Sequence, residues 1–275
     1  MAKERYLEGD IKSLIFNHLI NNNLLGKNDT IINEFIIGNY TRRVDLALIK
    51  SQKLHAFEIK SEADNLSRLE GQIIKYLEYF DKVTVVAASK HISKILSLAP
   101  PNVAIWEIRD KKIIILRRGK AKNITDKLRF LEYLRVSELL QIARQEKLVF
   151  QSNRRKTLEK GLIYLPTHKL REYSIKYLKK RYQPTTDLFF QEINKANYAS
   201  LENLSLLRIN RNNKVPNNSS VRFISLYPYR FNFYLRIHTG IHGGQWYINL
   251  CLVIYRHKKG LNHYSSSLLV LYVVM

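Results

Sequence analysis

The chain is poor in cysteine and in long apolar runs. Its single cysteine, Cys251, excludes a disulfide framework and a zinc site built from cysteines, so any metal must be held by oxygen or imidazole. No apolar run reaches the roughly 18 residues needed to span a bilayer. The first ten residues, MAKERYLEGD, carry charges where a signal peptide would be apolar. We therefore expect a soluble, cytoplasmic protein that does not enter a membrane.

Carboxylates are also absent from the end of the chain, where no Asp or Glu follows Glu202. The whole chain has 46 basic and 23 acidic residues, a formal net charge of +23. This excess favours a polyanionic partner, with DNA as the first expectation and a membrane-surface or RNA-binding protein as a weaker one. Of the acidic residues, 14 lie within residues 1–118. Metal or acid–base chemistry is therefore expected in that segment.

Residues 1–118 mix helical and strand patterns, and their apolar content is sufficient for a buried core. Three short apolar segments separated by turn-forming residues indicate a β-meander near the start. A helix, these strands, a second helix and a buried strand predict an α/β fold with a mixed central sheet flanked by helices. The expected helices are 4–22, 66–80 and 91–98, and the expected strands are 31–37, 44–49, 54–59, 82–89, 103–108 and 112–117.

Two further segments follow this expected core. Residues 119–205 are mainly helical in pattern and form a helical extension, whose basic residues suit either a solvated face or a DNA-facing one. Residues 206–275 form a basic tail of short β-like runs rich in Asn, Ser and Tyr. The tail is either a basic, aromatic β module that binds nucleic acid or a poorly packed segment produced by a shifted reading frame or a recent extension.

One group of charged residues falls inside the expected strands. Alternation along the third strand places Glu58 and Lys60 on one face, and Asp45 of the preceding strand can approach Glu58 if the two strands form an antiparallel hairpin. Asp45 and Glu58, with the Ile59 carbonyl, can offer oxygens to Mg²⁺ or Mn²⁺, and Lys60 can hold a nucleophilic water. The alternative is surface charge on an edge strand, but an unpaired carboxylate inside a core strand is costly. The pattern predicts a metal-dependent phosphodiesterase site.

These residues also resemble a known family. Glu34 followed by RRVDLALI, HAFEIKSEADNLSRLEGQIIKY and FDKVTVVAASKH resembles the PD-(D/E)XK nuclease superfamily, most closely a little-studied bacterial branch of restriction-endonuclease-like proteins. The resemblance covers about residues 8–205, and the Pro-Asp of the superfamily name is Val44-Asp45 here. It implies a restriction-endonuclease-like core in which Asp45, Glu58 and Lys60 match the central motif, and Gln72 and Tyr76 look like the Gln-xxx-Tyr element that some branches use beside the active site.

Other residues are candidates for supporting roles. Related nucleases often carry another acidic ligand, for which Glu34 is favoured over Asp10 on the opening helix. Arg42 and Arg43 precede Asp45 and can grip a phosphate, although surface arginines need no function. Arg68 belongs to a run shared with the family and is a further DNA-binding candidate.

The sequence thus predicts a Mg²⁺- or Mn²⁺-dependent deoxyribonuclease that acts in repair, restriction or defence. Its rival is a catalytically silent module that keeps the nuclease fold and binds DNA without cutting it. The intact Asp45, Glu58 and Lys60 favour the enzyme. The pattern leaves the oligomeric state open, a homodimer included.

Overall fold

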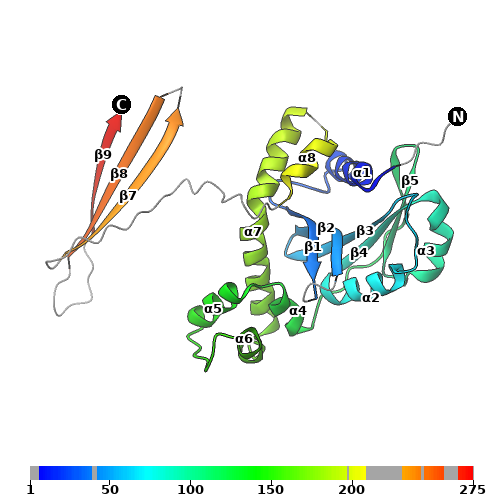
Figure 1. Cartoon of the computed structure of the whole chain (residues 1–275), viewed down its shortest axis with the longest axis horizontal. Helices are drawn as coiled ribbons and strands as arrows, with labels where there is room; N and C mark the ends of the chain where they lie inside the picture. The colour runs from blue at the N-terminus through cyan, green and yellow to red at the C-terminus, as the bar shows by residue number, and fades with distance from the viewer. Residues whose placement is uncertain are drawn as a thin grey trace. The chain divides into compact units, whose positions relative to one another are not determined.

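The computed structural model describes residues 6–38, 42–196 and 198–208 with their side chains, and the backbone of three strands within 231–274. The chain forms two compact units, Met1–Ile209 and Asn210–Met275. The first unit holds a six-stranded sheet and the α-helices of the described residues (Figure 1). The expected helical extension therefore lies in the same compact unit as the sheet.

The sheet of the first unit has the order β1-β2-β3-β4-β5-β6. Its outer pairs are antiparallel, whereas β3–β4 and β4–β5 are parallel. The mixed sheet and the opening meander expected from the sequence are thus confirmed. The strands are β1 (Thr30–Ile37), β2 (Arg42–Lys50), β3 (Lys53–Lys60), β4 (Lys82–Ala88), β5 (Ala104–Arg109) and β6 (Lys112–Arg117).

Two of the hairpins in this sheet turn within two residues. Ser51 and Gln52 join β2 to β3 with φ of 48° and 63°. Asp110 and Lys111 join β5 to β6 with φ of 50° and 59°. Positive φ at both central positions matches the right-handed twist of the flanking strands. The first of these turns sets the register that brings β2 and β3 together at the candidate site.

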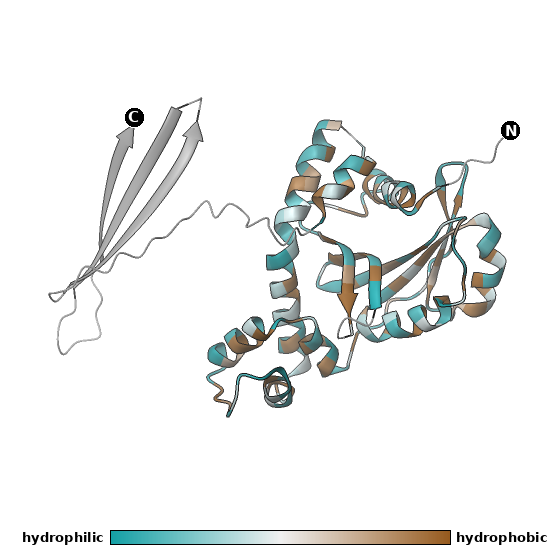
Figure 2. Ribbon diagram, in the orientation of Figure 1, coloured by the Kyte–Doolittle hydropathy of each residue, from teal (hydrophilic) through white to brown (hydrophobic). Residues whose placement is uncertain are grey.

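Helices cover both faces of the sheet, and a hydrophobic cluster fills each interface. One cluster joins the sheet to α2, α3, α4, α5, α6 and the first half of α7, and the other joins it to α1, α8 and the last part of α7 (Figure 1). The strands between them are largely apolar (Figure 2). The helices are α1 (Glu8–Asn21), α2 (Leu69–Tyr79), α3 (Ile92–Leu98), α4 (Lys127–Glu132), α5 (Val136–Gln145), α6 (Arg155–Leu162), α7 (Thr167–Ala196) and α8 (Leu201–Leu206), with a 3₁₀ turn at Ser89–His91.

The edge strand β1 is covered by α7. Thr186 of α7 is fully buried, and its Oγ1 accepts a hydrogen bond of 2.9 Å from the backbone N–H of Ile31. Thr30 Oγ1 donates to Gln183 Oε1 at 2.5 Å. Pro184 lies between these two helical residues and removes one helical N–H. Side chains of α7 therefore satisfy polar groups of an edge that would otherwise be free to pair with another strand.

Replacement of Thr186 tests this edge contact. We expect Thr186→Val to lower the free energy of unfolding by about 1–3 kcal/mol, because the buried N–H of Ile31 loses its acceptor. Urea unfolding measures the loss. Thr185→Val is the matched control, since Thr185 Oγ1 bonds only the Tyr182 carbonyl within its own helix. Equal stability of the two variants would contradict the role given to Thr186.

The second unit contains a three-stranded antiparallel sheet in the order β7-β8-β9. Its strands are β7 (Phe231–His242), β8 (Gln245–Arg256) and β9 (Ser266–Val274). The side chains of the expected basic tail lie outside the described residues from 209 onward. Among the residues described, no helix has both the length and the apolar character needed to cross a bilayer.

Candidate active site on strands β2 and β3

Asp45 and Glu58 lie close together, as expected from the sequence, because their strands pair in an antiparallel hairpin. Leu46 lies opposite Phe57 in the antiparallel β2–β3 ladder, and the same register carried one residue further places Asp45 opposite Glu58. Asp45 Oδ2 accepts a hydrogen bond of 2.7 Å from the backbone N–H of Ile59. Two carboxylates are therefore held side by side at the end of the hairpin.

Glu58 is the centre of a buried hydrogen-bond network. Its Oε1 lies 2.7 Å from Lys60 Nζ, and its Oε2 accepts a bond of 2.8 Å from the hydroxyl of Tyr76. Lys60 Nζ also donates to Gln72 Oε1 at 3.1 Å. Only 1% of Glu58 and 8% of Lys60 are exposed. The structure thus brings Glu58, Lys60, Gln72 and Tyr76 together, with the last two side chains projecting from neighbouring turns of α2.

Burial and mutual repulsion shape the electrostatics of the two carboxylates. Burial, followed by the nearby charge of Glu58, raises the pKa of Asp45 to about 8. Burial also raises the pKa of Glu58, although Lys60 opposes this change. The pKa of the Tyr76 hydroxyl is raised by burial and by Glu58, so this group remains a hydrogen-bond donor. Without a cation, the pair therefore retains a proton at neutral pH.

A second charged cluster lies beside Asp45 and is centred on Lys12 of α1. Lys12 Nζ lies 2.6 Å from Glu34 Oε1, 2.7 Å from Glu8 Oε1 and 2.8 Å from Asn33 Oδ1. Lys12 is only 5% exposed, and its charge lowers the pKa of Asp45 against the larger effect of burial. This lysine was not among the site residues expected from the sequence. Lys12 lies one helical turn before Phe16, on the buried face of α1, and this spacing could have identified it from the sequence.

The conformation of Glu34 directs its carboxylate toward this cluster. Glu34 has φ of 56°, a value uncommon for a residue other than glycine. Ile32 packs in the hydrophobic cluster on the α2 side, and strict alternation would send Glu34 there as well. Phe35 occupies that side instead, while Glu34 binds Lys12 and, through Oε2, Arg43 Nε at 2.7 Å. Such strained residues cluster at functional sites.

Asp10 and Arg68 lie at helix ends. Asp10 Oδ2 accepts a hydrogen bond of 2.9 Å from the backbone N–H of Leu7, so its carboxylate caps α1. Glu8 is the α1 carboxylate whose charge raises the pKa of Asp45. Arg68 is exposed at the start of α2, where its carbonyl accepts from the N–H of Gln72 at 3.0 Å. Asp10 as a metal ligand and Arg68 as a DNA contact remain predictions.

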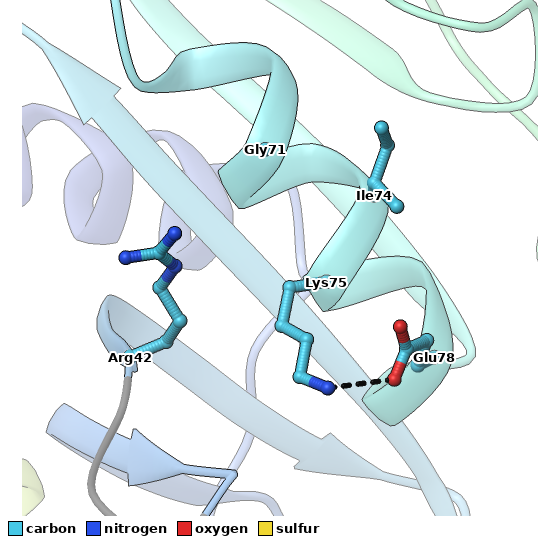
Figure 3. Close-up of a pocket in the computed structure, with 5 residues that line it drawn as sticks. All are labelled: Arg42, Gly71, Ile74, Lys75 and Glu78. Carbon is cyan, nitrogen blue, oxygen red and sulfur yellow. Dashed lines mark hydrogen bonds and ion pairs between the residues drawn. The ribbon is translucent and has the colours of Figure 1, made fainter.

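The two arginines before Asp45 have different surroundings. Arg43 is paired with Glu34, and its carbonyl lies 3.0 Å from the Tyr76 hydroxyl. Arg42 lines an open pocket of about 270 Å³ along the outer side of α2, shown in Figure 3. Lys75 and Glu78 form a 2.9 Å ion pair at the same pocket. Both arginines are exposed, but Arg43 is held by Glu34 whereas Arg42 lines the pocket.

The donor set of the site fits a hard divalent cation. Mg²⁺ is commonly bound through one or two carboxylates while waters complete its shell. Asp45 and Glu58 supply two such groups, and a cation would offset the burial that raises both pKa values and the repulsion by Glu58 that raises the pKa of Asp45 further. In the described part of the chain, no three Asp, Glu, His or Cys side chains gather closely enough to hold a metal alone. Water or substrate oxygens would therefore be required as further ligands.

Comparisons with known proteins identify relatives of this chain. The family model described as bacteriophage P4 protein cII matches residues 1–208. Protein cII of Enterobacteria phage P4 is 33% identical over 221 residues, which cover 78% of this chain and 82% of that protein. A solved structure of a Silicibacter pomeroyi protein of unknown function aligns at 16% identity and a TM-score of 0.36, over 52% of this chain and 90% of that chain. The chain belongs to the bacteriophage P4 protein cII family.

Proposed function

We propose that this protein is a metal-dependent deoxyribonuclease with a restriction-endonuclease-like core. The observation that carries the proposal is the pair of buried, mutually repelling carboxylates Asp45 and Glu58 with Lys60 in direct contact. Buried carboxylates with raised pKa values beside a buried lysine are costly to folding and are typical of catalytic sites. The strand arrangement is compatible with such a core, because an antiparallel β1–β2–β3 meander leads into parallel β3, β4 and β5.

Asp45 and Glu58 would hold Mg²⁺ or Mn²⁺. When bound, the cation would neutralise charge on the phosphate. The chain's own residues have the remaining roles. The ammonium of Lys60, 2.7 Å from Glu58, can orient the water that attacks phosphorus and stabilise the charge that develops. Gln72 holds Lys60 from its other side, and Tyr76 fixes the second oxygen of Glu58. The network therefore keeps both charged groups in one geometry before substrate binds.

A cleavage assay with Lys60→Ala tests this proposal. Supercoiled plasmid and single-stranded DNA are incubated with the wild type and the variant in Mg²⁺, Mn²⁺ or EDTA. We expect cutting by the wild type only with metal, and a loss of about 100-fold or more in the variant while DNA binding persists. Lys53→Ala is the matched control, because Lys53 is exposed on the same strand. A wild type that binds DNA and never cuts it would overturn the proposal.

A second candidate function, a DNA-binding module without turnover, is favoured by one observation. Both oxygens of Glu58 already have hydrogen-bond donors, Lys60 and Tyr76, and the side chain is 1% exposed. A network satisfied in this way is stable without a metal. Titration with Mn²⁺ followed by calorimetry separates the candidates. The nuclease requires binding that Asp45→Asn weakens, whereas the silent module predicts no binding at this pair.

A further inference from the structure

The outer face of α6 is basic. Lys156, Lys160 and Tyr164 follow at intervals of four residues, so they lie on one side of the helix and of the turn that ends it. All three are exposed, and Tyr164 is 86% exposed. Leu158 and Leu162 are fully buried on the inner side of the same helix. The apolar side of α6 is thus used in the core, and its outer side combines two lysines with an aromatic ring.

The carboxylates of Glu159 on α6 and Glu146 at the end of α5 already have partners. Glu159 Oε1 binds Arg155 at 2.5 Å. Glu146 binds Lys169 at 2.9 Å and accepts from the Tyr173 hydroxyl at 2.6 Å. Across the described ranges, no ion pair includes Lys156 or Lys160, and none includes Lys147 or Arg154 of the preceding loop. Among the described residues, the positive charges of Lys156 and Lys160 are therefore not compensated by an ion pair.

The loop between α5 and α6 packs closely against α6. The ring of Phe150 packs directly on Gly161, where an added Cβ would lie 1.9 Å from Phe150 Cε1. Glycine at this position allows the close approach of the loop to α6. Val149, the neighbour of Phe150, is 96% exposed. The α6 patch is defined here as Lys156, Lys160 and Tyr164.

We propose that the α6 patch binds a single-stranded stretch of the nucleic acid on which the protein acts. An exposed aromatic ring among unpaired cations matches the way in which proteins stack unpaired bases while neutralising phosphates. A lipid surface fits less well, because interfacial helices present a broad apolar face and that side of α6 is buried. This inference rests on the proposed function, since it assigns to the DNA substrate a contact outside the Asp45–Glu58 site.

Binding of a fluorescently labelled oligothymidylate, followed by anisotropy in EDTA, tests the patch without cleavage. We expect Tyr164→Ala to weaken binding about 10-fold and to affect a duplex of equal length less, because a paired base offers no face for stacking. The double variant Lys156→Glu, Lys160→Glu should weaken binding further and reduce the dependence of affinity on salt. Matched controls are Tyr198→Ala, whose side chain is 58% exposed, and Lys94→Glu on the exposed side of α3.

The outcomes distinguish this inference from the proposed function. Selective loss of oligothymidylate binding in the α6 variants supports the patch even if the wild type never cuts DNA with Mg²⁺ or Mn²⁺. If the α6 variants lose no more oligothymidylate affinity than Tyr198→Ala and Lys94→Glu, the proposed role of the α6 patch is overturned and the nuclease proposal is unaffected. Equal losses for single strands and duplexes would overturn the stacking role of Tyr164. Binding only to vesicles of anionic phospholipid would also overturn the proposal.

Discussion

Asp45→Asn is expected to abolish metal-dependent DNA cleavage and at the same time to stabilise the metal-free protein. Loss of one of two metal-binding carboxylates should reduce cleavage by about 1,000-fold or more. The pKa of Asp45 is raised from 3.8 to about 8, so between these values the folded chain holds a proton that the unfolded chain has lost. The free energy of unfolding must therefore fall as the pH rises from about 4 to about 8. The asparagine side chain carries no such proton and can still accept from Ile59 N–H.

Chemical unfolding of the wild type and Asp45→Asn at several pH values measures this effect. The variant should gain stability relative to the wild type as the pH rises from 4 to 8 in EDTA, and Mg²⁺ should stabilise only the wild type. Metal affinity of the wild type should increase up to about pH 8, because binding displaces the proton shared by the pair. Asp64→Asn, in the loop after β3, is the control. A variant that is less stable than the wild type at pH 8 would contradict the electrostatic account of the site.

Arg171→Leu is expected to cause the largest loss of stability among substitutions away from the site. Asp81 is fully buried, and its two oxygens accept from the Arg171 guanidinium at 2.8 and 2.9 Å. The same oxygens accept from the backbone N–H groups of Leu54 and Ile124, so one carboxylate joins the sheet, α7 and the segment before α4. Removal of the arginine leaves a buried carboxylate without its cation, which costs about 3–5 kcal/mol.

An ion pair between Lys169 of α7 and Glu146 at the end of α5 provides the control for this prediction. Lys169 and Glu146 lie 2.9 Å apart, but the lysine side chain is 43% exposed. Lys169→Leu should therefore cost at most about 1 kcal/mol in the same urea unfolding experiment. Addition of Asp81→Asn to Arg171→Leu should recover part of the loss, because the buried charge is then removed. Similar midpoints for Arg171→Leu and Lys169→Leu would show that the buried pair does not hold the helical part on the sheet.

Secondary structure was largely determined by local sequence pattern. The segments expected as strands at 44–49 and 54–59 correspond to β2 and β3, and the helix expected over 66–80 corresponds to α2. Alternation also predicted that Glu58 and Lys60 share a face, as their 2.7 Å contact confirms. These features depend on the side-chain periods of strands and helices, which are written in consecutive residues.

Register and long-range pairing were decided by the tertiary structure. The Ser51 and Gln52 turn sets the β2–β3 register, although neither residue is a glycine that would reveal it. Lys12, 22 residues from Glu34 in the chain, becomes part of the site only when α1 packs on the sheet. The position of Glu34 likewise depends on its positive φ, which reverses the alternation of β1. The sequence by itself determined which residue types and which elements could form a site, because those follow from local periodicity. The three-dimensional packing alone decided which charges meet, because such contacts join segments that no local pattern relates.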